Sequence, residues 1–369
     1  MKKSVLALLV TFATSYVCAQ SLADDNVSMS KSGFKEKKFF KGDKRIYINS
    51  FLIYNEIYRE DKDVKQGGKG FGNVVKGKAS VVQTLGLSGV EAEDLQNVAN
   101  KLYNSFVGEL KAEGFEILTS AQAGKTKVYE GWQLVEGPIV KDAGLPGVLS
   151  VIPEGHSYYI RGVNKDGKDI KSKGFSRLMN KGGSGSTGLA FSNSAALSKQ
   201  LDDAIVVDVC LSYLFTQEGD NWLRGNSAKV IVKTNFRLGS GAVSKLNDSK
   251  SIVKINNEKV ETISSYINFA KGKFSAGAES LLQTSIKKNM YIKGVIDSER
   301  ITSSQSQNIV YPTSFNTYQL GNDFYTSVED RKSTKTNWID VDSKKYAEGM
   351  YLAGSAYIDA ALAEFKSKQ

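Results

Sequence analysis

Three glycines between residues 180 and 197 have a spacing that could hold a phosphate group. The segment is NKGGSGSTGLAFSNSAAL, in which Gly183, Gly185 and Gly188 form the pattern G-x-G-x-x-G. In dinucleotide-binding folds such glycines let the backbone approach a pyrophosphate at the start of a helix. The pattern has meaning only with a buried strand before it, a helix after it and an acidic residue about 20 positions later.

The surroundings of these glycines meet only half of the requirement. A helix is predicted to begin near Ser192 or Ser194, and Asp208 lies at a suitable distance for a ribose-binding acid. However, residues 171–181 (KSKGFSRLMNK) are polar where a buried strand should be, and Leu189 stands where a P-loop has lysine. The sequence therefore predicts a mobile Gly/Ser connection that binds no nucleotide. No cofactor is expected.

Histidine and cysteine are too scarce for most metal and nucleophile chemistry. His156 is the only histidine, which excludes multi-histidine zinc motifs and leaves His156 as a turn or strand-start residue. Cys210 lies in the apolar run AIVVDVCLSYLF, which predicts a buried and inert thiol. If Cys18 is removed with an N-terminal segment, no internal disulfide can form.

Acidic side chains keep one enzyme class open, because a glycosidase needs only two carboxylates. No pair can be assigned from spacing alone, and calcium would need more oxygen ligands at closer spacing. We expect Asp202 and Asp203 to end the helix that precedes the run around Cys210. The other acids considered are Glu116 with Glu130, Asp340 with Asp342, and Asp208.

Aromatic residues give the candidate for a binding surface. The segment KRIYINSFLIYNEIYRE is rich in Ile, Phe and Tyr with partial alternation, which predicts a strand. Most of the aromatic side chains are explained by strand propensity and core packing. The Tyr-rich end, with Tyr54 and Tyr58, could instead form an exposed sheet edge that binds a protein partner.

The N-terminus has the features of a secretory signal peptide. Met1-Lys2-Lys3 is followed by the apolar run SVLALLVTFATSYV, and Val17 and Ala19 fit a cleavage site before Gln20. Cys18 also raises lipoprotein processing as an alternative. Residues 1–19 are therefore predicted to be a signal peptide and residues 20–43 a polar leader segment. We expect an exported protein, periplasmic, outer-membrane-associated or extracellular.

The composition is that of a globular protein with a basic surface. The chain has 369 residues, 41% hydrophobic and 24% charged, and a net charge of +10. The charges are scattered and Lys outnumbers Arg, which leads at bidentate phosphate sites. A Lys-rich solvated surface is favoured, and no nucleic-acid partner is expected. No later segment is apolar enough for a transmembrane helix, although peripheral contact with a membrane stays open.

The pattern of elements predicts an α+β or α/β fold with a mixed sheet, packed helices and an irregular Gly/Pro-rich insertion. Residues 44–240 form the α/β domain, and residues 241–369 contain strands and a C-terminal helix packed on the same core. Ser88 and Glu91 fit a capping box, and Gly114 supplies the stop of the first helix. The apolar stripe of that helix comprises Leu95, Val98, Leu102, Phe106 and Leu110.

Residues 44–238 resemble the α/β envelope domain of the curli-secretion channel family and of the N-terminal domain of the Tol-Pal periplasmic protein. The likeness lies in the helix-Gly-Phe-strand unit LYNSFVGELKAEGFEIL and in the helix NSAALSKQLDD that leads directly into AIVVDVCLSYLF. The curli lipobox and channel-forming amphipathic hairpins are not evident. The resemblance implies an envelope location and partner binding, not a pore.

These observations favour an exported, non-enzymatic envelope protein that acts in assembly by contact with other envelope proteins or with its own copies. Two alternatives stay open: a secreted hydrolase that uses two carboxylates, and a periplasmic protein that binds lipid or lipopolysaccharide. Two facing carboxylates in a pocket would favour the hydrolase. A deep apolar cavity ringed by Lys would favour the lipid-binding protein, and an open sheet edge would favour the contact function.

We predict that export removes residues 1–19. The basic start, the apolar run and the small residue Ala19 are the features that a signal peptidase recognises. Intact-mass measurement of the exported protein should give a chain that begins at Gln20. A chain that retains Met1 would contradict the prediction, and a lipid on Cys18 would place the protein among the lipoproteins.

Overall fold

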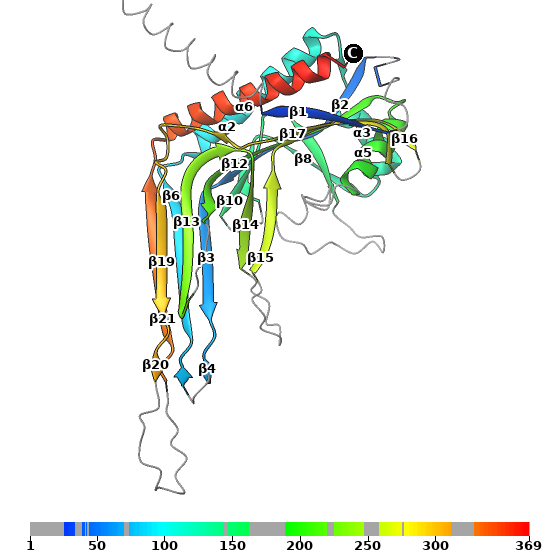
Figure 1. The fold of residues 1–369 in the computed structure, drawn as a ribbon. Coiled ribbons are helices and arrows are strands. Elements are labelled where there is room, and N and C mark those ends of the chain that lie inside the picture. The colour runs from blue at the N-terminus through cyan, green and yellow to red at the C-terminus, as the bar shows by residue number, and fades with distance from the viewer. Residues whose placement is uncertain are drawn as a thin grey trace, which may run out of the picture.

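The computed structural model describes residues 26–33, 39–40, 42, 44–69, 74–143, 147–161, 189–219, 225–246, 258–274, 277–310 and 328–368. The predicted signal peptide and the three glycines Gly183, Gly185 and Gly188 lie outside the described residues. Figure 1 shows a head, in which helices cover a sheet, and a strand-built arm that projects from it.

The head is organised by a mixed sheet, and the predicted α+β class is confirmed. Its two central strands, β2 and β12, run parallel, while their other neighbours along the main path pair antiparallel. The two strands are buried along almost their whole length, as expected for strands with both faces covered. The order of the main path is β1 (Val27–Ser32), β17 (Gly277–Ile286), β16 (Tyr266–Phe274), β12 (Ile205–Glu218), β2 (Arg45–Glu56), β10 (Val148–Ile152) and β9 (Ile139–Asp142).

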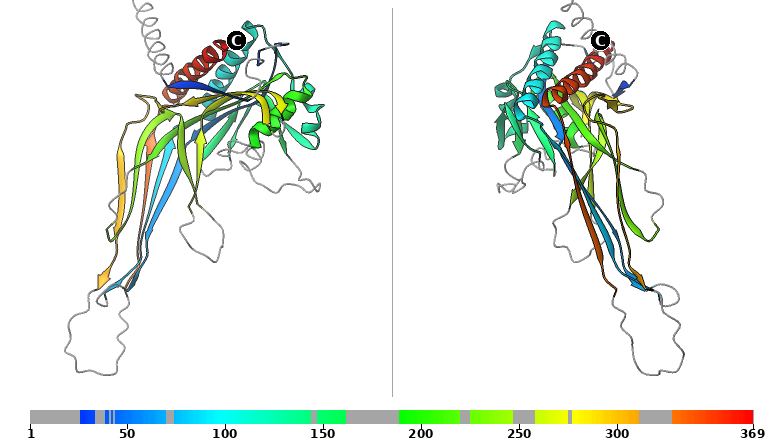
Figure 2. Two further views of the ribbon diagram at one scale, coloured as in Figure 1. Left: turned by 45° about the vertical axis from the view of Figure 1, so that its right-hand side comes forward. Right: turned by 90° about the vertical axis from the view of Figure 1, so that its left-hand side faces the viewer.

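Helices cover both faces of this sheet (Figures 1 and 2). Helices α2 (Ala92–Ala112) and α6 (Ser343–Lys366) pack on one face in the largest apolar core. Helices α5 (Leu189–Gln200), α3 (Ser120–Gly124) and η3 (Lys127–Tyr129) pack on the opposite face. Within the described residues, no helix combines the length and the apolar character needed to cross a membrane.

Helix α2 has the predicted apolar stripe but a different start. All five stripe residues are buried, and Gly114 ends the helix with a φ of +81°, a conformation that glycine adopts without strain. The predicted capping box is wrong, because Glu91 is the N-cap and makes no side-chain cap bond. Ser88 belongs instead to the preceding strand, where its hydroxyl bonds the carboxylate of Asp340.

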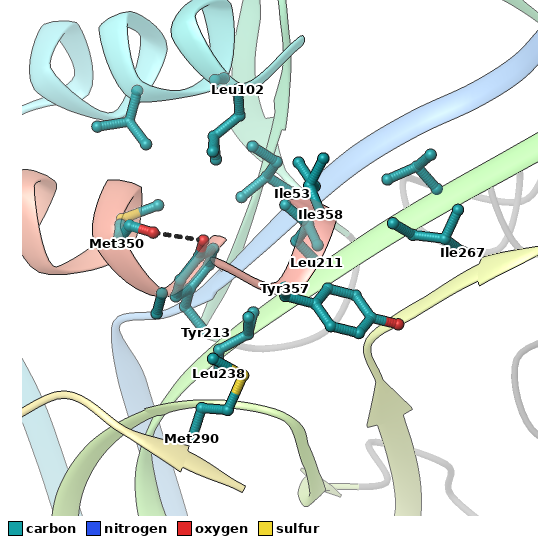
Figure 3. Close-up of a cluster of buried hydrophobic side chains, with 14 of the residues drawn as sticks. Ile53, Leu102, Leu211, Tyr213, Leu238, Ile267, Met290, Met350, Tyr357 and Ile358 are labelled. Atoms are coloured by element: carbon teal, nitrogen blue, oxygen red, sulfur yellow. Dashed lines mark hydrogen bonds between the residues drawn. The ribbon is translucent and has the colours of Figure 1, made fainter. Parts of the chain in front are cut away.

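Helix α6 is capped by Asp342. The Asp342 carboxylate accepts a hydrogen bond from the backbone N–H of Lys345 at 3.1 Å. Small residues let the helix lie close to the sheet, so that the Tyr213 hydroxyl reaches the Met350 carbonyl at 2.7 Å (Figure 3). Gly354 faces the same hydroxyl, and no space is left there for a larger side chain.

The arm consists of two small sheets packed against each other. One sheet has the order β21-β6-β3, and the other is formed where β13 continues from the head and pairs with β19. Figure 2 shows both sheets leaving the head in the same direction. The strands are β3 (Tyr58–Lys65), β6 (Ala79–Ser88), β13 (Ser227–Leu238), β19 (Arg300–Ser306) and β21 (Arg331–Asp340).

Two segments of polar or Gly-rich composition contain strands. The Gly- and Lys-rich segment after Asp63 continues the β3–β6 hairpin through β4 (Gly68–Lys69) and β5 (Val75–Lys76). The short β20 (Ile309–Val310) pairs with β5 near the end of the arm. The polar leader likewise contributes β1 and places Phe39 in the core.

Four smaller strand pairs complete the fold of the described residues: β7 (Glu116–Ile117) with β2, β8 (Trp132–Glu136) with β11 (Ser157–Arg161), β14 (Ser240–Leu246) with β15 (Glu258–Ser264), and β18 (Met290–Tyr291) with β13.

The arm and the helical layer are joined by two similar strand–helix units. Strand β6 leads into α2 and strand β21 leads into α6, and the two strands pair in parallel along their whole length. At their ends, the Val341 N–H donates to the Ser88 carbonyl, and the Glu91 N–H donates to the Ser343 hydroxyl at 3.0 Å. The position of β21 is therefore set by the same contacts that align the two core helices.

We predict that Gly354→Ala destabilises the protein while Gly108→Ala stabilises it. A Cβ at residue 354 would meet Tyr213 and approach Leu102 to 2.9 Å, whereas a Cβ at residue 108 on exposed α2 surface meets nothing within 4 Å. The first change should cost about 1–3 kcal/mol, and the second should gain about 0.5–1 kcal/mol from helix propensity. Urea unfolding of both variants decides it, and equal stability would contradict the close packing of α6.

Candidate functional site

The two predicted edge residues lie in different environments. Strand β2 has β12 on one side and β10 on the other, so Tyr54 is an interior and buried residue, and its predicted place at an edge is wrong. Tyr58 begins β3, which is an edge strand of the three-stranded arm sheet. Strand β2 ends at Glu56 and β3 begins at Tyr58, so Tyr54 lies in the head sheet and Tyr58 lies in the arm.

The longest exposed edge of the described chain is β21. This ten-residue strand pairs with β6 on one side only, and its burial pattern is almost entirely exposed. In the described residues, no backbone hydrogen bond is made by its other side. An edge of this kind offers a row of N–H and C=O groups to an extended segment of another polypeptide.

An exposed tryptophan lies near the head end of β21. Trp338 is 61% exposed and covers Gly86 on the neighbouring strand, where any side chain would collide with its ring. Tyr58 lies on the other side of Gly86, with the two ring centroids 6.5 Å apart. An aromatic ring over a strand glycine protects the backbone and leaves one face of the ring available for contact.

The arm is attached to the head by a buried polar cluster centred on Thr216, hereafter the neck cluster: Glu56, Arg59, Asp61, Thr216 and Arg237. Glu56 is the last residue of β2 and is 1% exposed. Its carboxylate accepts hydrogen bonds from the backbone N–H groups of Phe215 and Thr216, each at 3.0 Å, and from the Thr216 hydroxyl at 2.6 Å. These bonds lie where the ladder between β12 and β13 shifts register.

Two buried guanidinium groups complete the neck cluster. Arg59 donates to the Asp61 carboxylate at 2.6 Å and to the Thr216 hydroxyl at 3.2 Å. Arg237 donates to the Thr216 carbonyl at 2.6 Å and to the Asn235 side chain at 2.7 Å. With two carboxylates and two guanidinium groups, the cluster is formally neutral, which is the condition for burying charges at moderate cost.

Burial changes the proton affinity of the neck cluster. Burial raises the pKa of the Glu56 carboxyl above its ordinary value, against the opposing effects of the Arg59 charge and the Thr216 hydrogen bonds. Burial also lowers the pKa of the Arg237 guanidinium. A carboxyl with a raised pKa can mark a catalytic acid. Here, however, the group is buried and holds strand N–H groups, which favours a structural role.

A second polar cluster surrounds Asp208, under α5. The ladder between β2 and β12 shifts register at Asn49, so that Asn49 and Ser50 both donate to one oxygen of Asp208 at 2.7 Å. Ser194 of α5 donates to the other oxygen at 2.7 Å, and Tyr129 of η3 bonds Asn49. Asp208 already accepts three hydrogen bonds and joins α5 to the sheet, which is a structural function.

The remaining candidate acids are dispersed. Asp202 and Asp203 have positive φ angles of 53° and 59° and form the turn after α5, as predicted. They pair with Arg45 at 3.6 Å and with Lys199 at 3.4 Å. Among the described residues, no group of three His, Cys, Asp or Glu side chains could hold a metal ion. The other acids have separate places: Glu116 and Glu130 are exposed, Asp340 bonds Ser88, and Asp342 caps α6.

His156 and Cys210 are both buried. The His156 Nε2 atom accepts the Phe51 backbone N–H at 3.0 Å, so the imidazole satisfies a strand donor. Cys210 lies inside β12, and burial raises the pKa of its thiol to about 12, which keeps it protonated and unreactive, as predicted.

Sequence reasoning missed β21 and the neck cluster. Strand β21 (RKSTKTNWID) has neither the alternation nor the β-branched content of a typical strand, and its partner β6 lies about 250 residues earlier. Glu56 and Arg59 are separated by only two residues in FLIYNEIYRE, and charges that interrupt such an apolar run are a usable sign of a buried ionic cluster.

Comparisons with known proteins add no relative: no family model matches the chain, and no curated protein or solved structure is significantly similar to it. The resemblance to the curli-channel and Tol-Pal envelope domains therefore stays a prediction.

We predict that Glu56→Leu strongly destabilises the protein and that Glu60→Leu does not. The first variant leaves the N–H groups of Phe215 and Thr216 without an acceptor and removes a negative charge from beside the buried Arg59 and Arg237, which should cost about 3–5 kcal/mol. Glu60 is half-buried on the following strand, β3, and its carboxylate accepts the Tyr58 hydroxyl, so its loss should change stability by about 1 kcal/mol or less. Urea unfolding measures the free energy of unfolding of both variants. Equal losses would show that the neck cluster contributes no more stability than the single hydrogen bond of Glu60.

Proposed function

We propose that the protein is an exported, non-enzymatic component of the cell envelope that acts in assembly by binding partner polypeptides along β21. The observation that carries the proposal is the ten-residue exposed edge of β21 on an arm that projects from the head. Backbone pairing along a strand edge supplies affinity, and the flanking side chains supply specificity. The partners proposed are other envelope proteins, copies of this chain included.

The other edges of the described chain are less suited to pairing. The head sheet ends in β1 and β9, which have six and four residues, and short edge strands limit edge-to-edge association. The outer side of β3 faces β13, where the Asp63 carboxylate accepts the Lys229 N–H at 2.9 Å. This contact joins β3 to β13 on that side, and a partner strand would have to displace it. Strand β21 therefore stands out as the long edge without such protection.

The export part of the proposal is supported by the sequence of residues 1–19. The non-enzymatic part is supported by the use of the candidate groups: the Asp208 carboxylate, the Glu56 carboxylate and the His156 imidazole all hold backbone or side-chain donors of the fold. No observation gives the hydrolase or the lipid-binding alternative comparable support.

Proline scanning of β21 tests the proposal. Consecutive N–H groups of a strand point to opposite sides, so one of Ser333→Pro and Thr334→Pro removes a bond to β6 while the other alters only the open edge. We expect one variant to lose stability and the other to fold normally but to lose the partners, or the self-association, of the wild type. Circular dichroism with thermal melting assigns the two classes, and each variant thus serves as the control of the other.

Light scattering and co-purification of the exported protein then give the binding result. Thr302→Pro, on the exposed β19, tests whether a proline on another arm strand has the same effect. Partners that remain bound to the folded β21 variant would contradict the proposal.

A further inference from the structure

We infer that the segment that pairs with β21 is acidic at the end that lies near the tip of the arm. This inference rests on the proposed function, because it names the chemistry of the partner at the same edge. Its basis is a group of three exposed cations, Arg331, Lys332 and Lys335, in the first half of the strand. Within the described residues, none of the three has an ion-pair partner.

The neighbouring strand cannot neutralise these charges. Strand β6 (ASVVQTLGLS) carries no charged residue, and the residues opposite the three cations are Ala79, Ser80 and Gln83. The two acids that precede β21 are Glu329 and Asp330, and one Asp330 oxygen accepts the Lys78 N–H at 2.8 Å. The positive charge of the strand is therefore not neutralised by β6.

The register places the cations on both faces of the arm sheet. Successive side chains of a strand alternate between faces, so Arg331 and Lys335 share one face and Lys332 lies on the other. A partner strand at the open edge would have a side chain next to each of them, whichever face it uses. Opposite charges at such cross-strand positions are favourable and like charges are unfavourable. A second β21 strand aligned in parallel would repel this one.

The head end of β21 favours an apolar residue of the partner instead of an acidic one. Trp338 is 61% exposed and lies over Gly86, so an apolar side chain of the partner could pack on its exposed face. The partner is thus an extended segment with Asp or Glu near the arm tip and an apolar residue near the head. The competing explanation is that the lysines keep the edge free of any partner, because charged residues discourage strand association.

Three synthetic ten-residue peptides of Thr and Val, which carry three Glu, three Gln or three Lys at the same positions, distinguish these explanations. The full exported chain is titrated with each peptide, and hydrogen exchange of the β21 amides reports pairing at the edge. We expect the Glu peptide to protect the β21 amides and to bind about tenfold more tightly than the Gln peptide. The Lys peptide should bind more weakly still, and added salt should reduce the differences.

A double variant and a matched control locate the effect. Lys332→Gln with Lys335→Gln should remove the preference for the Glu peptide, whereas Lys287→Gln with Lys288→Gln, an exposed pair in the head, should keep it. Equal protection of β21 by all three peptides would overturn the charge inference and leave the proposed edge function intact. Absence of β21 protection by every peptide would overturn the edge function and this inference with it. Self-association of the β21 double variant without peptide discrimination would show that the lysines only guard the edge.

Discussion

The structure depends on how two central strands are ended. Strands β2 and β12 pair in parallel through the head, and their register stops at Asn55 and Tyr213. Strand β12 continues without that neighbour, and its next N–H groups would be buried without partners. The Glu56 carboxylate accepts two of them, at Phe215 and Thr216, in the place of another residue of β2. Because an unpaired buried N–H group is costly, this one side chain allows the sheet to leave the head as an arm.

The charge that solves the hydrogen-bonding problem creates an electrostatic one. A lone buried carboxylate would be strongly unfavourable, and Arg59 and Arg237 supply the compensating charge through Thr216. Such a network stabilises only one geometry, since each donor has a fixed direction. The polar contacts continue into the arm, where Gln83 bonds Ser303 of β19 and Asn337 of β21. The two arm sheets are therefore aligned by specific polar contacts as well as by apolar packing.

The same features explain what the sequence predicted and what it did not. Helix α2 follows from the local spacing of its apolar residues, the buried Cys210 follows from the apolar run around it, and the structure contains both. Strands β3 and β21 of the arm escaped prediction because they carry charged and polar side chains on both faces, so they show no clean alternation of apolar residues. Tyr54 and Tyr58 illustrate the limit, because they are four residues apart in one apolar segment. The interior strand β2 ends at Glu56 and the edge strand β3 begins at Tyr58, and nothing in the local sequence marks this change.

The open edge of β21 is not a loosely attached strand, and this bears on its use. The strand ends at Asp340, which bonds Ser88 at the end of β6, and two residues later Asp342 caps α6. Helix α6 is then fixed in the core by the bond from Tyr213 and by close contact at Gly354. A strand edge that is held at one end by the core of the head presents its N–H and C=O groups in a fixed row. Binding a partner at this edge therefore costs less conformational entropy than binding at a flexible segment would. The buried side chains that stabilise the head therefore also fix the position of the exposed backbone of β21.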